Sequence, residues 1–365
     1  MIVFYLPDLR AGGAERVIIN LIKHCHAHSD LPIALLLGNK EGQLLDQVPP
    51  DITVYTLNCR SAKTSVVALI KFCHRYKPDV IFATLGASLA IALAKSFIPG
   101  NIKVINRLGN TIGAEKLLYK NSLKRLLYIY ANKLIGTASD FSIFQCNYMA
   151  NDYMKETGVR LKDYTVIYNP VDTQKVETLA TEAIDIIYDI VAVGRLDVQK
   201  DYPTLITACN ILKHRGIKFS IAILGDGKLK GQLVDQIGQH QLNGMVTLLG
   251  HVKNPYPYIA RAQYLISSSL YEGFSNVIIE ALCLGTPVIA TECPGGNKET
   301  IDVNNNGYLC EPSDATAIAN TIETALGERA KFNSEKIKDN AVAKYNLQKI
   351  GDAYKDVITS IVKLP

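Results

Sequence analysis

The sequence predicts an α/β protein with two doubly wound, Rossmann-like domains that face each other across a cleft. Its 365 residues are about twice the usual length of a single domain. Short β-branched runs alternate with longer amphipathic stretches, which indicates parallel sheets covered by helices on both faces. The same alternation starts again near residue 185, so one doubly wound domain follows another.

The first series of strands and helices fills the N-terminal half of the chain. Its apolar runs predict strands at residues 2–6, 32–37, 52–57, 79–84, 103–107 and 133–139. Between them, apolar residues at helical spacing predict helices at residues 14–25, 64–76 and 115–133.

The second series predicts strands within residues 185–196, 218–227, 245–252, 262–269, 286–292 and 306–312. A helix at residues 201–216 ends at Gly216, a suitable residue just past a helix C-terminus. The join lies within residues 169–185, which carry Pro170 and a polar run. We therefore expect domains at residues 1–175 and 176–345, with a helix at 346–365 that packs back toward the first domain.

Composition excludes several classes of protein. The eight cysteines show no C-x-x-C pair, which fits reduced thiols in a cytoplasm rather than a disulfide framework. The first residues have no basic start and reach Pro7 and Asp8 at once, unlike a signal peptide. No run of about 18 apolar residues occurs, so no membrane span is expected. We expect a cytoplasmic protein, with peripheral contact at the inner face of the cell membrane as an open alternative.

Charge is distributed unevenly along the chain. Residues 60–133, which we call the basic segment, contain 13 Lys or Arg but only two acidic residues, Asp79 and Glu115. Residues 186–365 contain 18 basic and 18 acidic residues. The first half therefore favours an anionic partner.

Ligands bind open parallel sheets at the carboxyl ends of the strands, close to helix N-termini, so the loops there are candidate sites. Residues 9–17 place Gly12 and Gly13 between a strand and a helix, where the backbone can approach a phosphate. A tight turn with no ligand remains the alternative. Arg195 and Lys200 follow the first strand of the second series and can clamp a diphosphate, or can be two solvated cations. Residues 225–227 indicate a tight turn.

The segment EGFSNVIIE, residues 272–280, is the fourth candidate. Glu272 precedes a glycine turn, and a helix begins near Asn276 with free N–H groups that favour an anion. Glu280 lies about one turn inside that helix. Because a carboxylate accepts two hydrogen bonds from a vicinal diol, the two glutamates can bind hydroxyls on either side of a phosphate. An exposed loop glutamate and a helix-surface glutamate are the plain alternative.

Metal binding has little support in the sequence. No D-x-D motif occurs, which favours a diphosphate neutralised by Arg195 and Lys200 over one bridged by a metal. His24 and His28 share a helix face, but they lie far from the strand ends, so a solvated helix end is expected there.

Taken in order, these segments resemble family 4 retaining glycosyltransferases of the GT-B architecture over nearly the whole chain. The resemblance rests on GGAER near the N-terminus, NPVD at 169–172, VGRLDVQKDYPTLI, ILGDG and EGFSNVIIEALCLGTPVIAT. Arg107, in the segment VINRLGN, resembles the bacterial branch of this family that acts on lipid-linked or surface polysaccharides. The resemblance implies transfer of a hexose or N-acetylhexosamine from a nucleotide-sugar, with UDP favoured, to a glycan or lipid-linked acceptor.

The resemblance also implies roles for individual residues. Arg195 and Lys200 would hold the donor diphosphate, Glu272 would contact the transferred sugar, and Glu280 would bind the ribose. The base would lie against His251 and Val252, and Gly13 would approach the diphosphate from the first domain. Backbone amides of the turn and the first helical residues would face the sugar and phosphates: Gly273, Phe274, Ser275, Asn276 and Val277.

One departure from the family concerns the acceptor side. Many relatives have a histidine in the first domain beside the reacting carbon, but none occurs here between His74 and His214. The matching region contains Asn106 and Arg107. The basic segment also carries Lys120 and Lys124. Together with Arg107, these lysines could hold an acceptor pyrophosphate or an anionic bilayer, or they could form an ordinary solvated helix face.

The mechanism implied is a front-face transfer in which the leaving diphosphate helps to deprotonate the acceptor, with no metal cofactor. Three alternatives remain. A nucleotide-sugar 2-epimerase shares the architecture, but its usual catalytic residues in the first domain are not identifiable. A non-catalytic two-domain sugar-binding protein would normally carry a signal peptide. A nucleic-acid binder could use the basic segment, but no recognition motif occurs, so no nucleic acid is expected as a partner.

Overall fold

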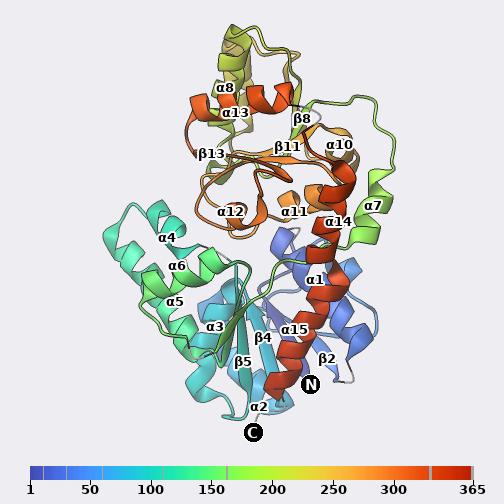
Figure 1. The fold of residues 1–365 in the computed structure, drawn as a ribbon. Coiled ribbons are helices and arrows are strands. Elements are labelled where there is room, and N and C mark those ends of the chain that lie inside the picture. Colours follow the sequence, from blue (N-terminus) through green and yellow to red (C-terminus); the bar gives the residue numbers. More distant parts are fainter. Residues whose placement is uncertain are drawn as a thin grey trace. The chain divides into compact units, whose positions relative to one another are not determined.

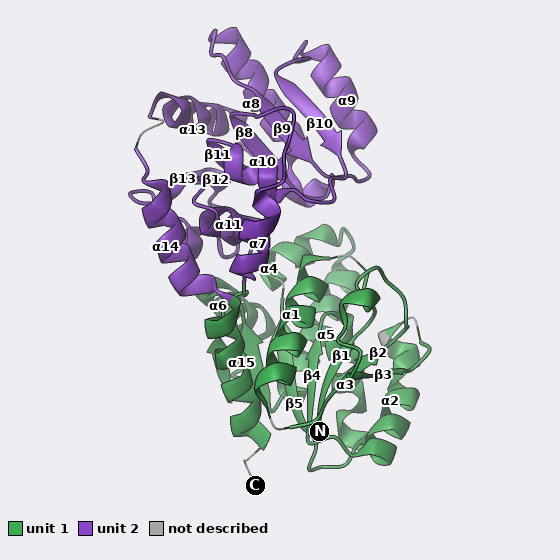
Figure 2. Cartoon of the chain, turned by 90° about the vertical axis from the view of Figure 1, so that its right-hand side faces the viewer, with its two compact units in different colours: residues 1–170, 347–365 green, residues 171–346 purple. Residues whose placement is uncertain are grey.

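The computed structural model describes residues 1–10, 12–29, 31–59, 61–109, 111–161, 163–328 and 331–362. The chain forms two compact units, coloured separately in Figure 2. Unit 1 consists of Met1–Pro170 and Leu347–Pro365, and unit 2 of Val171–Asn346. The change from one unit to the other lies within residues 169–185, a few residues before the expected boundary at 175.

Unit 1 is built on a parallel sheet. Among the described residues, seven strands lie in the order β3-β2-β1-β4-β5-β6-β7. The order reverses between β1 and β4, which both pair in parallel with their neighbours. The strands are β1 (Ile2–Leu6), β2 (Ile33–Leu37), β3 (Thr53–Thr56), β4 (Val80–Thr84), β5 (Lys103–Leu108), β6 (Phe141–Phe144) and β7 (Tyr164–Val166).

Helices cover both faces of this sheet. The helices of unit 1 are α1 (Gly13–His28), η1 (Leu45–Gln47), α2 (Ala62–Tyr76), α3 (Gly86–Ala94), η2 (Lys95–Phe97), α4 (Ile112–Glu115), η3 (Lys116–Leu118), α5 (Ser122–Ala138), α6 (Asn147–Thr157) and α15 (Leu347–Val362). Every side chain of β1 is buried. Phe4 packs in a cluster with α1 and α15, whereas Val3 and Tyr5 pack in another with α2 and α3. A continuous apolar run such as IVFYL is typical of a parallel strand covered on both sides.

The C-terminal helix α15 belongs to unit 1 and packs beside α1 (Figure 1). Its Tyr354 and Ile358 lie in the same apolar cluster as α1. His24 of α1 is also buried here, and its Nε2 lies 3.0 Å from Asp352 Oδ1. The expectation of a solvated helix end at His24 is therefore wrong, because α15 covers it.

Two predictions for residues 115–139 are also wrong. Residues 133–139, expected as a strand, continue helix α5, and the strand that follows is β6. The single helix expected at 115–133 is divided into α4, η3 and α5. Asn121 causes the division, because its side chain accepts hydrogen bonds from the backbone N–H groups of Leu123 and Lys124 and starts a new helix.

Unit 2 repeats the architecture with six described parallel strands in the order β10-β9-β8-β11-β12-β13. The order reverses between β8 and β11. The strands are β8 (Ile190–Val193), β9 (Ile221–Leu224), β10 (Val246–Gly250), β11 (Tyr264–Ser267), β12 (Val288–Thr291) and β13 (Gly307–Cys310). The helices are α7 (Thr173–Ala180), η4 (Val198–Lys200), α8 (Tyr202–His214), α9 (Lys230–Gln239), α10 (Tyr256–Arg261), α11 (Asn276–Cys283), α12 (Asn297–Thr300), α13 (Ala315–Gly327) and α14 (Ser334–Tyr345).

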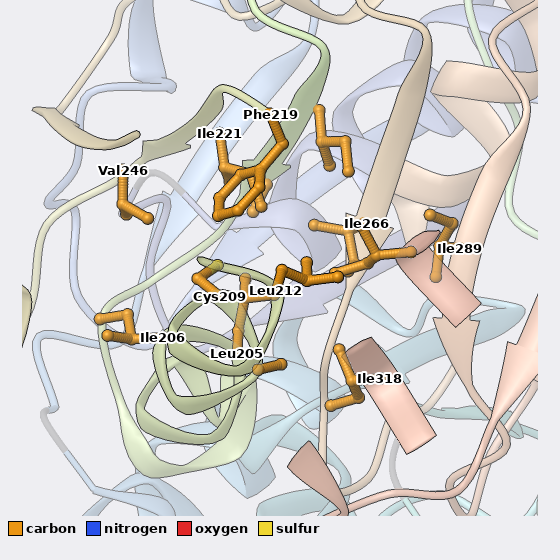
Figure 3. Packing of buried hydrophobic residues seen from close by; sticks show 14 of the residues in the cluster. Leu205, Ile206, Cys209, Leu212, Phe219, Ile221, Val246, Ile266, Ile289 and Ile318 are labelled. Atoms are coloured by element: carbon orange, nitrogen blue, oxygen red, sulfur yellow. The ribbon is translucent and has the colours of Figure 1, made fainter. Parts of the chain in front are cut away.

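One face of the unit 2 sheet packs against α8, α9 and α13. Figure 3 shows Leu205, Cys209 and Leu212 of α8 beneath Ile221 and Ile266 of the sheet. This packing fixes the strands whose carboxyl ends carry the candidate loops. Among the described residues, no helix combines the length and hydropathy needed to cross a bilayer.

Candidate functional site

The strongest candidate site lies where the strand order of the unit 2 sheet reverses. The loops after β8 and β11 leave adjacent parallel strands at the same edge of the sheet. At such a switch point, two loops part to opposite faces and leave room for a ligand. Arg195 and Lys200 follow β8, and Glu272 follows β11, so all three belong to this pair of loops.

Lys200 and Glu272 form an ion pair between the two loops. Lys200 Nζ lies 2.6 Å from Glu272 Oε1, and the two side chains are only 17% and 8% exposed. The Ser269 hydroxyl donates to the same carboxylate oxygen at 2.6 Å. Shielding from water strengthens these contacts, so the pair holds both groups in fixed positions.

Backbone and side-chain hydrogen bonds hold the two loops in register around the pair. Leu270 N donates to Gln199 O at 2.8 Å, and the Gln199 amide donates to Tyr271 O at 3.0 Å. The Ser268 hydroxyl donates to Lys200 O at 2.7 Å. Lys200 is therefore positioned by its own backbone as well as by Glu272.

Glycines allow the surrounding backbone to approach closely. Gly295 has φ +135°, and a Cβ there would lie 2.1 Å from Glu272 O. Gly225 has φ +151°, and a Cβ there would lie 1.9 Å from Gly194 O. Both positions exclude other residues, because the side chain would strain the backbone and collide with a carbonyl. The expected turn at 225–227 therefore supports the loop that carries Arg195.

Buried groups next to the pair respond to its charge. Burial raises the pKa of the Tyr202 hydroxyl, and the negative charges of Glu272 and Asp197 raise it further. Burial, followed by the charge of Glu272, raises the pKa of the Cys293 thiol to about 12. Both groups stay protonated at neutral pH, so neither adds a charge beside the Lys200–Glu272 pair.

Arg195 differs from Lys200 in its surroundings. Its side chain is 77% exposed, and its Nε lies 3.4 Å from Asp197 Oδ2. The other oxygen of Asp197 is buried and has no hydrogen-bond partner. The loop thus presents one exposed guanidinium and one shielded ammonium.

Helix α11 follows the glycine turn as expected, and Ser275 is its N-cap residue without a side-chain cap hydrogen bond. Phe274 is buried, with its ring 6.0 Å from that of Tyr345, which fixes the entry to the helix. Asn276 and Val277 are half-buried in the first turn.

The other residues predicted to bind the donor follow β10 and β11. Gly273 O accepts from Gly296 N at 2.9 Å. The Tyr256 hydroxyl lies 3.3 Å from Glu280 Oε1, so a tyrosine from α10 orients the second glutamate. His251 is exposed and Val252 is half-buried, directly after β10.

The predicted site residues of unit 1 differ in their burial. Gly13 is the first residue of α1, with Gly12 as its N-cap. Asn106 is fully buried on β5, where its amide donates to Ser139 Oγ at 2.8 Å and its Oδ1 has no partner. Lys120 and Lys124 are exposed.

Arg107 is only 2% exposed. Its guanidinium donates to the Tyr354 hydroxyl at 3.1 Å and to Asn169 Oδ1 at 2.6 Å. The prediction that Arg107 contributes to a basic surface for a bilayer is therefore wrong, because these contacts hold its side chain in the interior of unit 1.

Sequence reasoning missed several residues of the site. Ser269 donates to Glu272, and Gln199 donates to the loop after β11. Tyr256 contacts Glu280. In the sequence, these residues are marked only by lying next to a candidate site residue or at the end of a predicted strand. A rule that inspects every polar residue next to a candidate loop would have found Gln199 and Ser269, but not Tyr256.

Comparisons with known proteins cover both units. Residues 11–175 match the family described as Glycosyltransferase Family 4, and residues 187–344 match Glycosyl transferases group 1. The N-acetylgalactosamine-N,N'-diacetylbacillosaminyl-diphospho-undecaprenol 4-alpha-N-acetylgalactosaminyltransferase of Campylobacter jejuni is 26% identical, over 93% of this chain and 94% of its own. The amylovoran biosynthesis glycosyltransferase AmsK of Erwinia amylovora is 31% identical, over 40% of each chain.

Solved structures show the same fold. HepE of Anabaena, in complex with UDP and glucose, superposes with a TM-score of 0.78 at 21% identity, over 98% of this chain and 99% of its own. Two Rossmann-like units in this order are thus a shared architecture.

Proposed function

Because the chain belongs to the family 4 glycosyltransferases of GT-B architecture, we propose that it moves a hexose or N-acetylhexosamine from a UDP-sugar to a lipid-linked or glycan acceptor in bacterial surface polysaccharide synthesis. The observation that carries the proposal is the shielded Lys200–Glu272 pair at the switch point of unit 2. The pair combines a cation for phosphate with a carboxylate for sugar hydroxyls within hydrogen-bonding distance of each other.

The names of the relatives support the choice of donor and acceptor. The Campylobacter enzyme is named for an acceptor linked to diphospho-undecaprenol and for an α-linked N-acetylgalactosamine product. The Erwinia enzyme is named for amylovoran biosynthesis. The Anabaena structure contains UDP and glucose. We therefore propose UDP as the nucleotide and a lipid-linked or polysaccharide acceptor.

On this proposal, unit 2 binds the donor. The diphosphate competes with Glu272 for Lys200, and the exposed Arg195 closes on the phosphates from solvent. Glu272, released from Lys200 and still held by Ser269, then accepts hydrogen bonds from the sugar hydroxyls. Glu280, oriented by Tyr256, binds the ribose diol. The amides at the start of α11 complete the anion site.

The reaction we propose retains the anomeric configuration. The bond between the anomeric carbon and the diphosphate oxygen breaks, and the acceptor oxygen bonds to the same face of that carbon. The acceptor proton passes to the leaving diphosphate. Lys200 and Arg195 stabilise the charge that grows on that group, which is catalysis by fixed electrostatics. Charge neutralisation by these two residues, together with the missing D-x-D motif, supports transfer without a divalent metal.

A thermal-shift panel of UDP, GDP, ADP and their sugar conjugates tests the donor site. A rise with UDP and one UDP-sugar that persists in EDTA supports the proposal, and about 3 kcal/mol of stabilisation is expected at 100 times Kd. Glu280→Ala should weaken the shift with UDP. The exposed Lys230→Ala is a matched control, since Lys230 forms only a surface ion pair.

Product analysis then separates the alternatives. Transfer of labelled sugar to a polyprenyl-diphosphate-linked acceptor, with an α-linked product, is the expected result. Conversion of the UDP-sugar to its C2 epimer without any acceptor would instead identify an epimerase. A UDP shift without chemistry on any acceptor would favour the sugar-binding alternative.

A further inference from the structure

An exposed apolar surface lies on η3 and α5 of unit 1. Six large apolar side chains there are between 55% and 64% exposed, which is unusual for one short segment of a water-soluble face. We call them the 117–130 surface: Leu117, Leu118, Leu123, Leu126, Leu127 and Tyr130. Figure 1 shows α5 beside α4 and α6 within this unit.

The stripe follows the helical period on the solvent side of α5. Leu123, Leu127 and Tyr130 are spaced by four and three residues, so they share one helix face. The opposite face carries Tyr128, which is half-buried, and Ile135, which is buried. The helix packs against α3 and α6 with that face.

Polar contacts hold this arrangement on the inner side. The Tyr128 hydroxyl donates to Glu115, and the Tyr153 hydroxyl of α6 donates to Asn132 O. Burial, followed by the charge of Glu115, raises the pKa of Tyr128, so its hydroxyl remains a donor. These two hydrogen bonds hold one face of α5 against its neighbours, and the six side chains of the 117–130 surface are left facing solvent.

The short α4 is fixed in the same way. Gly113 N donates to Asp152 Oδ2 at 3.0 Å, and Lys116 pairs with Glu156 of α6. The outward direction of the leucines thus follows from specific contacts between α4, α5 and α6.

Basic residues border the apolar stripe. Lys120, Lys124 and Lys133 are exposed. Residues 111–138 contain five Lys or Arg and one acidic residue, Glu115, whose carboxylate is already bonded to Tyr128. An apolar face bordered by lysines is the pattern of a helix that lies in the interface of an anionic membrane.

We propose that the 117–130 surface binds an anionic lipid bilayer, with its leucines and Tyr130 among the head groups and its lysines against the lipid phosphates. Charge decides between this occupant and a second copy of the chain. An interface between identical copies would bring the same lysines together without acidic partners, whereas an anionic bilayer neutralises them. The membrane contact requires neither donor nor catalysis, so it does not depend on the proposed transfer reaction.

Co-sedimentation of the full chain with vesicles, in the absence of nucleotide-sugar, tests the proposal. One set of vesicles contains phosphatidylglycerol and phosphatidylcholine, and the other contains phosphatidylcholine alone. The wild-type chain should sediment only with the first set and less at high salt. Leu123→Gln/Leu127→Gln/Tyr130→Gln and Lys120→Gln/Lys124→Gln/Lys133→Gln should each weaken partitioning by about tenfold or more. Circular dichroism checks that each variant is folded.

A matched control replaces three exposed apolar residues of unit 2, as Ile186→Gln/Ile187→Gln/Val234→Gln. It should bind vesicles like the wild type. Because the chain contains no Trp, Leu127→Trp also gives a direct signal: its emission should shift to the blue with anionic vesicles. Val234→Trp should not shift.

Three results would overturn the proposal. The wild-type chain would stay in the supernatant with anionic vesicles, or the control triple variant would lose as much binding as the apolar variant. Alternatively, the wild type would form a dimer in the absence of lipid that the apolar triple variant cannot form, which would assign the surface to a second copy. If the wild-type chain binds anionic vesicles but transfers no sugar, only the proposed function is contradicted.

Discussion

The ammonium of Lys200 and the carboxylate of Glu272 lie 2.6 Å apart and join the loops that follow β8 and β11. Neither group can be removed alone without leaving the other charged and poorly hydrated. The pair therefore links the stability of unit 2 to the chemistry proposed for it, and the two contributions can be separated by mutation.

We predict that Lys200→Met and Glu272→Gln each lower the free energy of unfolding by about 3 kcal/mol, because each strands a charge. The double variant should recover most of that loss, since both charges are gone. Transfer activity should stay at least about 100-fold below wild type in all three, because the diphosphate loses its fixed cation or the sugar its carboxylate. Urea unfolding and kcat measurements check this.

The control for this cycle is Arg215→Met/Glu323→Gln, which removes a partly exposed pair between α8 and α13 of the same unit. It should change stability by less than about 1 kcal/mol and leave kcat unchanged. Normal turnover in Lys200→Met would remove Lys200 from the mechanism, whatever its effect on stability.

A second prediction concerns the space beside Lys200. A Cβ at Gly194 would lie 2.9 Å from Lys200 Cε and 3.0 Å from the Tyr202 hydroxyl. Gly194→Ala should therefore displace the lysine stem, since Tyr202 is buried and cannot yield easily. We expect kcat to fall by about tenfold, with a loss of about 1 kcal/mol in stability.

Gly231→Ala is the matched control for Gly194→Ala, because a Cβ at Gly231 in α9 meets no atom within 4 Å. It should leave kcat unchanged and raise stability by up to about 1 kcal/mol, since alanine favours a helix. Equal kinetics for the two variants would show that the position of Lys200 is not constrained by Gly194.

The loops of the candidate site in unit 2 could be predicted because they depend on local patterns. A buried apolar strand, then a loop with glycine and charged residues, then a helix specifies a strand-end loop, and the loops that carry Arg195, Lys200 and Glu272 follow this pattern. The contact between Lys200 and Glu272 was not predictable in this way, because it depends on the pairing of β8 with β11.

The misplaced elements have physical causes too. Residues 133–139 contain β-branched residues and suit a strand by propensity, but contacts of α5 with α3 and α6 extend the helix. The helical period of residues 115–133 was clear, but it could not show which face meets solvent. Burial of His24 and Arg107 depends on α15, more than two hundred residues away in the sequence.

A third prediction concerns α15 and unit 1. A Cβ at Gly351 would lie 2.4 Å from Cδ2 of the buried His24 ring, which Asp352 holds by a 3.0 Å contact. Gly351→Ala should therefore lower the free energy of unfolding by about 2 kcal/mol, although alanine by itself favours a helix. Urea unfolding followed by circular dichroism measures the change.

Gly238→Ala in α9, where a Cβ meets no atom within 4 Å, should instead stabilise the protein slightly. His24→Ala together with Gly351→Ala should cost less than the sum of the two single changes, because the first makes room for the second. Additive losses would mean that the ring and the glycine do not compete for space.

The fourth prediction is a loss of stability in alkaline solution. Burial raises the pKa of six thiols from an ordinary value of about 9 to about 12: Cys25, Cys73, Cys209, Cys283, Cys293 and Cys310. Above pH 9 these thiols ionise in the unfolded chain but not in the folded one. Each therefore lowers the free energy of unfolding by about 1.4 kcal/mol per pH unit between pH 9 and 12, and none does so below pH 8.

Urea unfolding between pH 6 and 10.5 measures this effect, and Cys209 of α8 isolates one thiol. Cys209→Ala should be about 1 kcal/mol less stable at pH 7 because of the cavity, yet lose stability less steeply above pH 9. Ile206→Val, in the same helix and equally buried, should show a similar loss at pH 7 with the wild-type slope. Because six thiols contribute in the same direction, we expect the free energy of unfolding to be clearly lower at pH 10 than at pH 7. A folding free energy that stays constant to pH 10.5 would contradict the ionisation argument.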